Sequence, residues 1–292
     1  AYLASGSDII VQKRSIPVSE IPEMNYGNYP GDGNHLTVSK NDKKLIENKD
    51  PYLAKIIRPV FGAREFINGL SRFCLWIDDD MLGEAVNNPI VSQKIEEVRN
   101  VRTTSRDASL NKIAYRSHQY RDRNCANNHF VIAPTVSSES REYLPTDIKT
   151  AHCVTTNQAF ALYDAPLWCV GLVASRLHLI WIATVCGKMK TDFRYSNTLG
   201  WNTFPVPTLT DQNKADLTRC AENILLAREA HFPATIADLY DPEAKIFVAR
   251  GIGDLFLPAS EALKVILNYG LAAVVWLIIG AVVARILNAL AP

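Results

Sequence analysis

A lysine and an aspartate two residues apart, Lys190 and Asp192, lie in the polar segment VCGKMKTDFRYS at residues 185–196. In an extended strand, residues two apart point to the same side, so both side chains could enter one groove. Lysine can donate hydrogen bonds to O6 and N7 of guanine, and aspartate can accept one from N4 of the paired cytosine. The pair is therefore a candidate reader of one G·C base pair. A surface ion pair on a hairpin is the alternative that these residues alone leave open.

Three neighbouring side chains suit a supporting role in the same contact. Lys188, Arg194 and Tyr195 carry cationic or phenolic groups. Such groups bind DNA phosphates, and these contacts fix the register of a protein on a duplex without reading its sequence. The three residues are therefore candidate phosphate contacts.

A second basic region lies upstream, between Lys94 and Arg123. It holds eight lysines or arginines against four acidic residues, although the whole chain of 292 residues has a formal net charge of only +1. Any nucleic-acid surface must therefore come from local clustering. A solvated helix face is the alternative explanation for this stretch.

The cysteines indicate a reducing compartment. The six cysteines are scattered and form no C-x-x-C pair, and no secretory leader is visible at the start of the chain. We therefore expect reduced thiols and a cytoplasmic protein. His118, Cys125 and His129 lie close together in sequence, but their spacing fits no standard zinc pattern. No metal site is predicted.

The pattern of elements predicts an α+β fold, a small mixed sheet with flanking helices. Short β-branched and aromatic runs separated by turn residues fill 129–164, and Ser39 and Pro89 mark helix starts. The apolar run at 166–186 predicts one buried core helix, because Arg176 and His178 at its middle disfavour a lipid-facing segment. His178 is expected to be a hydrogen-bonded core histidine. The segment NTLGWNTFPVP has turn and strand character, and an amphipathic helix is expected from about residue 211.

No catalytic machinery is evident. The chain contains no G-x-x-x-x-G-K-[ST] loop, no G-x-S-x-G elbow, no H-E-x-x-H motif and no dinucleotide-binding fingerprint. We therefore predict no catalytic residues, and a binding module is favoured over a self-contained enzyme.

Several blocks, in one order, resemble the target recognition domain of the MmeI-like (type IIL/IIG) family of single-chain restriction-modification enzymes. The blocks span most of residues 8 to 243, and they are IIRPVFGAREFINGLSRFCLWIDD (56–79), KIEEVRNVRTTS (94–105), SSESREYLP (137–145), SRLHLIWIATVCGKMKTDFRYSNTLGWNTFPVP (175–207) and ADLYDPE (237–243). The resemblance implies that Lys190 and Asp192 sit where family members place base-reading side chains. It also implies a DNA-facing role for the basic stretch, with Arg99, Arg102 and Arg106 joining Lys188 and Arg194 as phosphate contacts. Trp76 and Trp181 are expected to support the core.

The family resemblance also implies chemistry that this chain lacks. In the family, a nuclease domain and an S-adenosylmethionine-dependent adenine-N6 methyltransferase domain precede the recognition region. This sequence has neither an N-P-P-[FY] motif nor a glycine-rich cofactor loop. We therefore expect the chain to bind double-stranded DNA without a cofactor and to catalyse nothing alone. S-adenosylmethionine, and Mg²⁺ where a nuclease is present, would serve an upstream domain in cis or in trans.

The predicted organisation has four parts. They are a connector from a missing upstream methyltransferase domain (1–45), the DNA target recognition domain (46–208), a C-terminal helical segment (209–245) and a divergent tail with a hydrophobic helix (246–292). Residues 265–284 meet the length criterion for a membrane span. Three explanations stay open for the tail: a membrane anchor, a packed helix, or a frameshifted or fused end. The first corresponds to the alternative function, a membrane-anchored interaction protein.

Overall fold

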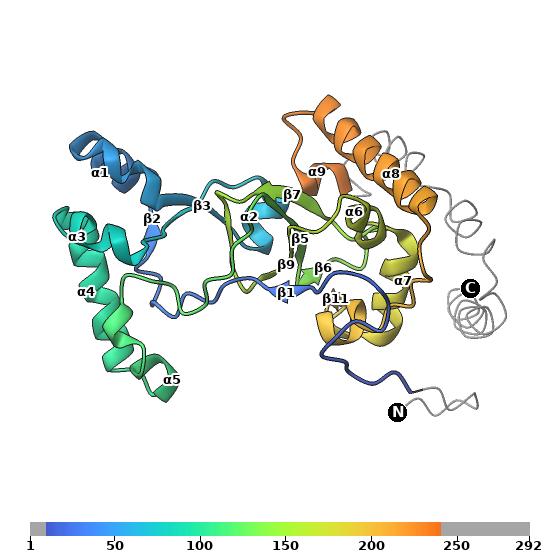
Figure 1. The fold of residues 1–292 in the computed structure, drawn as a ribbon, viewed down its shortest axis with the longest axis horizontal. Helices are drawn as coiled ribbons and strands as arrows, with labels where there is room; N and C mark the ends of the chain where they lie inside the picture. Colours follow the sequence, from blue (N-terminus) through green and yellow to red (C-terminus); the bar gives the residue numbers. More distant parts are fainter. Residues whose placement is uncertain (1–9, 241–292) are drawn as a thin grey trace.

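A computed structural model describes residues 10–240 of the chain, an elongated body with a β-sheet between two helical ends (Figure 1). One end, here the α4 end, contains α1 (Lys40–Lys49), η1 (Pro51–Ile56), η2 (Asp79–Met81), α3 (Leu82–Ala85), α4 (Pro89–Thr103), α5 (Ala108–Asn111) and η3 (Ala114–Arg116). The other, here the hairpin end, contains α6 (Trp168–Val173), α7 (Arg176–Val185), β10 (Gly187–Met189), β11 (Asp192–Arg194), η4 (Asn197–Trp201) and α8 (Asp211–Ala230). α2 (Ala63–Asn68) and α9 (Ile236–Tyr240) pack against each other beside the central sheet.

The central sheet is antiparallel and is covered on both faces. Its order is β1 (Asn25–Tyr26), β9 (Ala159–Tyr163), β5 (His129–Pro134), β7 (Asp147–Thr150). Alternate residues of a strand point to opposite faces. Val131 and Phe160 accordingly join the core beneath α6 and α8, whereas Phe130 and Ala161 join a second core beneath α2 and α9. Because both faces are buried, β5 and β9 are almost continuously apolar.

A second four-stranded sheet supports the α4 end. Its order is β2 (Thr37–Val38), β4 (Phe73–Leu75), β3 (Ile57–Phe61), β8 (Val154–Thr155). Only the β3–β8 pair is parallel, so this sheet is mixed. Trp76 follows β4 and is 3% exposed in the core of this end, as expected for a core residue. The prediction of an α+β fold with a small mixed sheet and flanking helices is confirmed.

Local capping signals in the sequence placed several helices correctly. The Ser39 hydroxyl accepts a hydrogen bond from the Asp42 N–H at the start of α1. α4 begins at Pro89, after the Asn88 cap, and α8 begins after a capping box formed by Thr210 and Asn213. Each cap satisfies N–H groups that have no partner within the helix.

The single helix predicted over 166–186 is wrong, because the segment forms two helices, α6 and α7. Ser175 lies between them, and its hydroxyl donates to the Leu172 carbonyl at 2.8 Å while accepting from the His178 N–H at 3.1 Å. The serine therefore ends one helix and caps the next. The strand character expected after Asn197 is also wrong, since residues Asn197–Trp201 form the single-turn π-helix η4.

Much of the segment predicted as a connector belongs to the folded body. β1 is a strand of the central sheet and β2 is a strand of the second four-stranded sheet. α1 lies at the α4 end. Upstream of β1, the chain follows η4, with the Trp201 indole donating to the Pro22 carbonyl at 2.7 Å. Between residues 10 and 240, no helix is both long and apolar enough to cross a membrane. The hydrophobic helix predicted at 265–284 lies outside the described residues.

Gly27 marks the closest approach between the N-terminal segment and the body. A Cβ atom there would lie 2.2 Å from the Thr156 carbonyl oxygen, which belongs to backbone and cannot turn aside. We predict that Gly27→Ala lowers the free energy of unfolding by about 2 kcal/mol. Gly83→Ala is the matched control, because a Cβ at that position meets nothing within 4 Å. Urea titration of both variants tests this, and equal stabilities would contradict it.

Candidate nucleic-acid interface

Lys190 and Asp192 lie at the tip of a β-hairpin. β10 and β11 pair antiparallel, with Gly187 opposite Arg194, Lys188 opposite Phe193 and Met189 opposite Asp192. Lys190 and Thr191 form the two-residue connection. β6 (Val136–Ser137) pairs with β11 as the third strand, so β10 is an edge strand, and all three of its residues are exposed.

The register assigns the charged side chains to opposite faces of the hairpin. Residues directly opposite each other share a face, and successive residues alternate. Asp192 and Arg194 therefore project to one side. Lys188 projects to the other, where its Nζ lies 3.3 Å from Glu139 Oε2 and 5.6 Å from the centre of the Phe193 ring. The structure thus brings the four predicted hairpin residues together, with Lys188 already engaged by a carboxylate.

The predicted extended geometry of Lys190 is wrong. Its φ is 58°, in the left-handed region, because the residue starts the turn rather than continuing a strand. A non-glycine residue there costs roughly 1–2 kcal/mol, and two-residue hairpin turns favour glycine or asparagine at such positions. Strain of this kind is concentrated at ligand-binding sites. The turn conformation therefore places the Lys190 side chain at the exposed tip of the hairpin.

The alternative of a surface ion pair on a hairpin does not describe the Lys190 and Asp192 side chains, although they do lie on a hairpin. Neither forms a salt bridge or a side-chain hydrogen bond with any other residue that the structure describes. Lys190 is exposed and Asp192 is half-buried. Both polar groups are therefore available to an external partner.

Tyr195 anchors the base of the hairpin instead of contacting phosphate. The residue is 2% exposed, which makes the phosphate contact predicted for it wrong. Its N–H donates to the Thr135 carbonyl at 2.9 Å, and its ring packs edge-on against Phe160 with ring centres 5.1 Å apart. Its hydroxyl lies 3.3 Å from His178 Nε2. The residue after β11 is thus fixed in the core.

His178 is the buried partner of this anchor, as predicted for a core histidine. Burial lowers the pKa of its imidazole to about 4, so the ring is neutral at pH 7. His178 Nδ1 lies 3.0 Å from the Val173 carbonyl oxygen, which can only accept, so Nδ1 carries the proton. Nε2 therefore accepts the hydrogen bond from the Tyr195 hydroxyl. Trp181, also expected in this core, is half-buried, and its indole donates to Thr203 Oγ1 at 3.3 Å.

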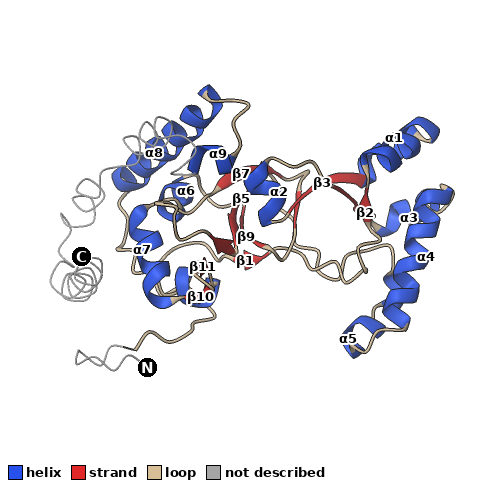
Figure 2. Ribbon diagram, turned by 180° about the vertical axis from the view of Figure 1, so that it is seen from behind, coloured by secondary structure: helices blue, strands red, loops and turns tan. Residues whose placement is uncertain are grey.

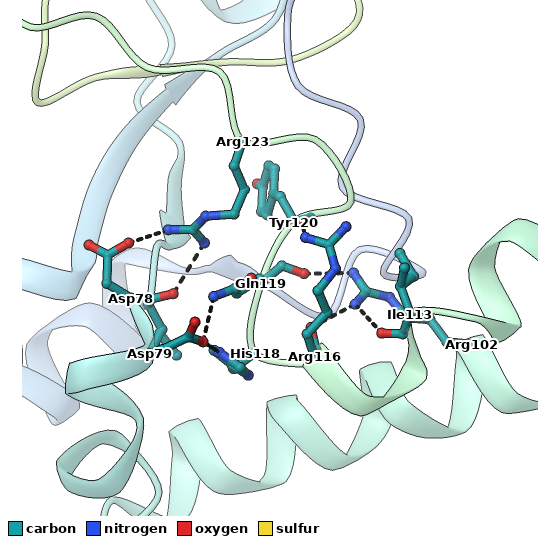
Figure 3. A network of polar contacts seen from close by, with 10 residues as sticks. Asp78, Asp79, Arg102, Ile113, Arg116, His118, Gln119, Tyr120 and Arg123 are labelled. Carbon is teal, nitrogen blue, oxygen red and sulfur yellow. Dashed lines mark hydrogen bonds and ion pairs between the residues drawn. The ribbon is translucent and has the colours of Figure 1, made fainter.

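Arg102 is a structural residue of the α4 end, and the phosphate contact predicted for it is wrong. The side chain is fully buried, and burial lowers its pKa to about 10. Figure 3 shows its contacts with Ile113, Arg116 and Gln119. Its guanidinium donates to five backbone carbonyls at distances of 2.6–3.3 Å: Pro30, Gly31, Ile113, Arg116 and Gln119. These bonds tie α4 to two loops and leave no donor for DNA.

Most other cations of the basic stretch are also bound internally. Lys94 contacts the Thr37 carbonyl at 3.0 Å, and Arg116 donates to the Arg121 carbonyl at 2.8 Å. Arg99 is half-exposed and pairs with Glu96 on the same helix at 3.2 Å. Arg106 is exposed, with no side-chain partner among the described residues. Arg99 and Arg106 therefore keep cationic surface.

The two predicted sets of contacts lie far apart. In Figures 1 and 2, α4 and α5 stand at one end of the long axis, and the hairpin lies on the far side of the central sheet from them. A duplex touching both sets would have to follow the long axis. Within residues 10–240, no group of three histidine, cysteine or acidic residues is placed to hold a metal ion, and His118 instead contacts Asp79 Oδ1 at 2.8 Å.

Comparisons with known proteins agree with one another. The family model described as "MmeI, target recognition domain" matches residues 5–208. DNA methyltransferase A of Bacillus subtilis (strain 168) is 35% identical over 241 residues, which is 82% of this chain and 27% of that protein. The Type IIL restriction-modification enzyme MmeI, solved in complex with DNA, superposes with a TM-score of 0.81 at 27% identity, covering 91% of this chain and 35% of that one. The chain thus spans about a third or less of the length of these relatives.

Replacing Arg102 should strongly lower the stability of the protein. In Arg102→Met, five buried carbonyls lose their donor, and we expect the free energy of unfolding to fall by about 3 kcal/mol or more. Arg106→Met removes an equal charge from the surface and should stay within about 0.5 kcal/mol of the unchanged protein. Urea unfolding measures both, and a similar effect of the two substitutions would contradict the structural role of Arg102.

The neutral His178 should make stability depend on pH. Its pKa in the folded protein, about 4, lies below the ordinary value of 6.5, so the unfolded chain binds more protons between these values. The stability that the neutral imidazole contributes is complete above pH 6.5 and is lost as the pH falls towards 4. By pH 5 the free energy of unfolding should have fallen by about 2 kcal/mol.

His178→Gln removes the titrating group and should flatten this dependence. The test compares the loss of unfolding free energy between pH 7 and pH 5 in the two proteins. Equal losses in the variant and the unchanged chain would show that His178 is not held neutral.

Proposed function

The chain belongs to the MmeI target recognition domain family, and we propose that it reads the DNA site of a restriction-modification adenine methyltransferase and positions the duplex for chemistry carried out elsewhere. The observation that carries this proposal is the hairpin tip. Lys190 and Asp192 are without side-chain partners in the described structure, while the next core residue, Tyr195, is buried. Polar groups held out on a rigid support are what base reading requires. The family match covers residues 5–208, and its end supports the proposed boundary at residue 208, before the segment that contains α8.

The proposed readout takes place in the major groove. A two-stranded ribbon fits this groove, and each base pair presents a distinct set of donors and acceptors there. Lys190 Nζ donates to guanine O6 and N7, and the Asp192 carboxylate accepts from cytosine N4. Because each residue addresses one partner of the pair, a reversed pair places a donor against a donor and an acceptor against an acceptor. Such a contact discriminates by about 1–3 kcal/mol.

Phosphate contacts supply affinity rather than selectivity. Arg194 projects to the same side of the hairpin as Asp192, and Lys188 reaches phosphate once it leaves Glu139. Arg99 and Arg106 are the exposed candidates at the α4 end. Each phosphate contact releases condensed counterions, so each adds about 0.9 to the slope of log affinity against log salt concentration.

Catalysis in this proposal belongs to an upstream methyltransferase domain in cis or in trans. S-adenosylmethionine, with Mg²⁺ for any nuclease, would bind there, in a cytoplasmic enzyme. The described residues do not fit the cofactor. At the strand–turn–helix of β3 and α2, the turn has one glycine, Gly62, whose N–H already donates to Glu65 Oε2 at 2.9 Å. No step is therefore assigned to this chain beyond binding duplex DNA.

Exchanging the two reading charges should change the base preference at one position. In the double variant Lys190→Glu, Asp192→Arg, donor and acceptor trade places, so the preferred pair should become C·G instead of G·C. Non-specific affinity should remain similar, since the net charge of the hairpin is unchanged. Selection of duplexes from a random pool by the full chain, followed by fluorescence anisotropy at low and physiological salt, measures both.

A matched exchange on α8 serves as the control. Arg219 and Asp216 form an exposed pair at 2.8 Å, and Asp216→Arg, Arg219→Glu should leave the selected site unaltered. If the hairpin exchange also leaves the site unaltered, the tip does not read a base. Absence of duplex binding by the unchanged protein at low salt would contradict the proposed function itself.

A further inference from the structure

A second cationic site lies between the α4 end and the central sheet. An open pocket of about 510 Å³ is found there, lined by Arg58, Trp76, Asp78, Arg123, Cys125 and His152 among others. These residues come from β3, the segment after β4, the 123–126 loop and the turn between β7 and β8. The pocket is therefore built by segments far apart in sequence and is separate from the hairpin.

Two guanidinium groups converge on one aromatic ring in this pocket. The Cζ atoms of Arg58 and Arg123 lie 5.5 and 4.4 Å from the centre of the Trp76 ring. Trp76 is itself fixed, being 3% exposed with its ring centre 5.5 Å from that of Tyr120. The contacts with the indole therefore restrict the positions of both guanidinium groups.

The two arginines differ in how far they are already satisfied. Arg123 donates to the Ile77 carbonyl at 3.1 Å and forms an ion pair with Asp78, as Figure 3 shows. Arg58 forms no ion pair with any described residue; its side chain contacts the Cys125 thiol, and its buried Nε has no hydrogen-bond partner. A buried donor without a partner costs about 1–3 kcal/mol. With one carboxylate against two guanidiniums, the pocket keeps a net positive charge.

The positive charge of the pocket also affects His152. It is exposed at the rim of the pocket, and burial, followed by the positive charges of Arg58 and Lys43, lowers the pKa of its imidazole. A neutral imidazole can donate one hydrogen bond to an anion without adding repulsion. An anion bound beside it would oppose the effect of the two cations and raise that pKa.

We propose that this pocket binds a phosphate group through Arg58, with Arg123 and His152 beside it. A guanidinium matches the oxygens of a phosphate in a planar, two-pronged contact, which the terminal nitrogens of Arg58 would form in this pocket. The phosphate is a phosphodiester of the bound duplex, in which case the inference rests on the proposed function, or it is a free phosphate. The second source does not depend on DNA recognition.

The first experiment uses inorganic phosphate alone. The His152 imidazole resonance is followed by NMR in the full chain as phosphate replaces chloride at constant ionic strength. A saturable shift is expected, with a raised His152 pKa at saturation. Arg58→Gln should abolish it, and Arg64→Gln, which removes an exposed arginine of α2, should retain it. Absence of a saturable shift in the unchanged chain overturns the phosphate site.

The second experiment uses duplex DNA and identifies the source. Non-specific binding is measured by anisotropy over a range of salt. Arg58→Gln should weaken it roughly tenfold and lower the salt slope by about 0.9, whereas Arg64→Gln should do neither.

If phosphate binds but the slope is unchanged, the ligand is a free phosphate and the site stands. If the unchanged chain binds phosphate but not duplex, the proposed function fails while this inference survives. A variant Arg58→Lys keeps the charge and should recover the slope only in part, which separates loss of contact from loss of folding.

Discussion

The buried Tyr195 side chain, packed on Phe160 and hydrogen-bonded to the neutral imidazole of His178, anchors the β10–β11 hairpin to the core. The hairpin sheet is weak on its own, since β10 is exposed along its length and the third strand, β6, has two residues. Tyr195 directly follows β11 and packs on Phe160 of the central sheet. Base reading requires side chains placed within about 0.5 Å of the productive geometry. In the proposed function, base selectivity at the tip would therefore depend on the buried contacts of Tyr195.

Positive charge in this chain has two distinct uses. In the α4 end, Arg102, Arg116 and Arg123 donate to carbonyls of irregular segments that no helix or strand satisfies. These arginines replace regular hydrogen bonding in a region with many connections. At the hairpin and in the Arg58 pocket, guanidinium and ammonium groups keep unsatisfied donors. Which of the two roles a cation has depends on whether nearby backbone carbonyls lack a donor. Amino-acid composition alone does not reveal this.

The sequence predicted features that depend on neighbouring residues better than features that depend on contacts between distant segments. Ser39 and Pro89 predicted helix starts because capping signals act within the first turn of a helix. The break at Ser175 was missed because apolar periodicity continues through it, although serine before His178 is itself a capping signal. The turn at Lys190 was missed because an i, i+2 pattern does not distinguish a strand from a two-residue hairpin. The burial of Arg102 and the meeting of Arg58 with Arg123 arise from contacts between distant segments, for which one sequence gives no periodic signal.

The central claim, that Lys190 reads guanine from the hairpin tip, is tested most directly by removing the acceptor it would use. The full chain is titrated with its selected duplex in which 7-deazaguanine, which lacks N7, replaces each guanine in turn. The account predicts that one position weakens binding by roughly tenfold, near 1.4 kcal/mol, and that Lys190→Ala abolishes this sensitivity. If no position responds, or if the response persists unchanged in Lys190→Ala, Lys190 does not read guanine through N7 and the hairpin account is wrong.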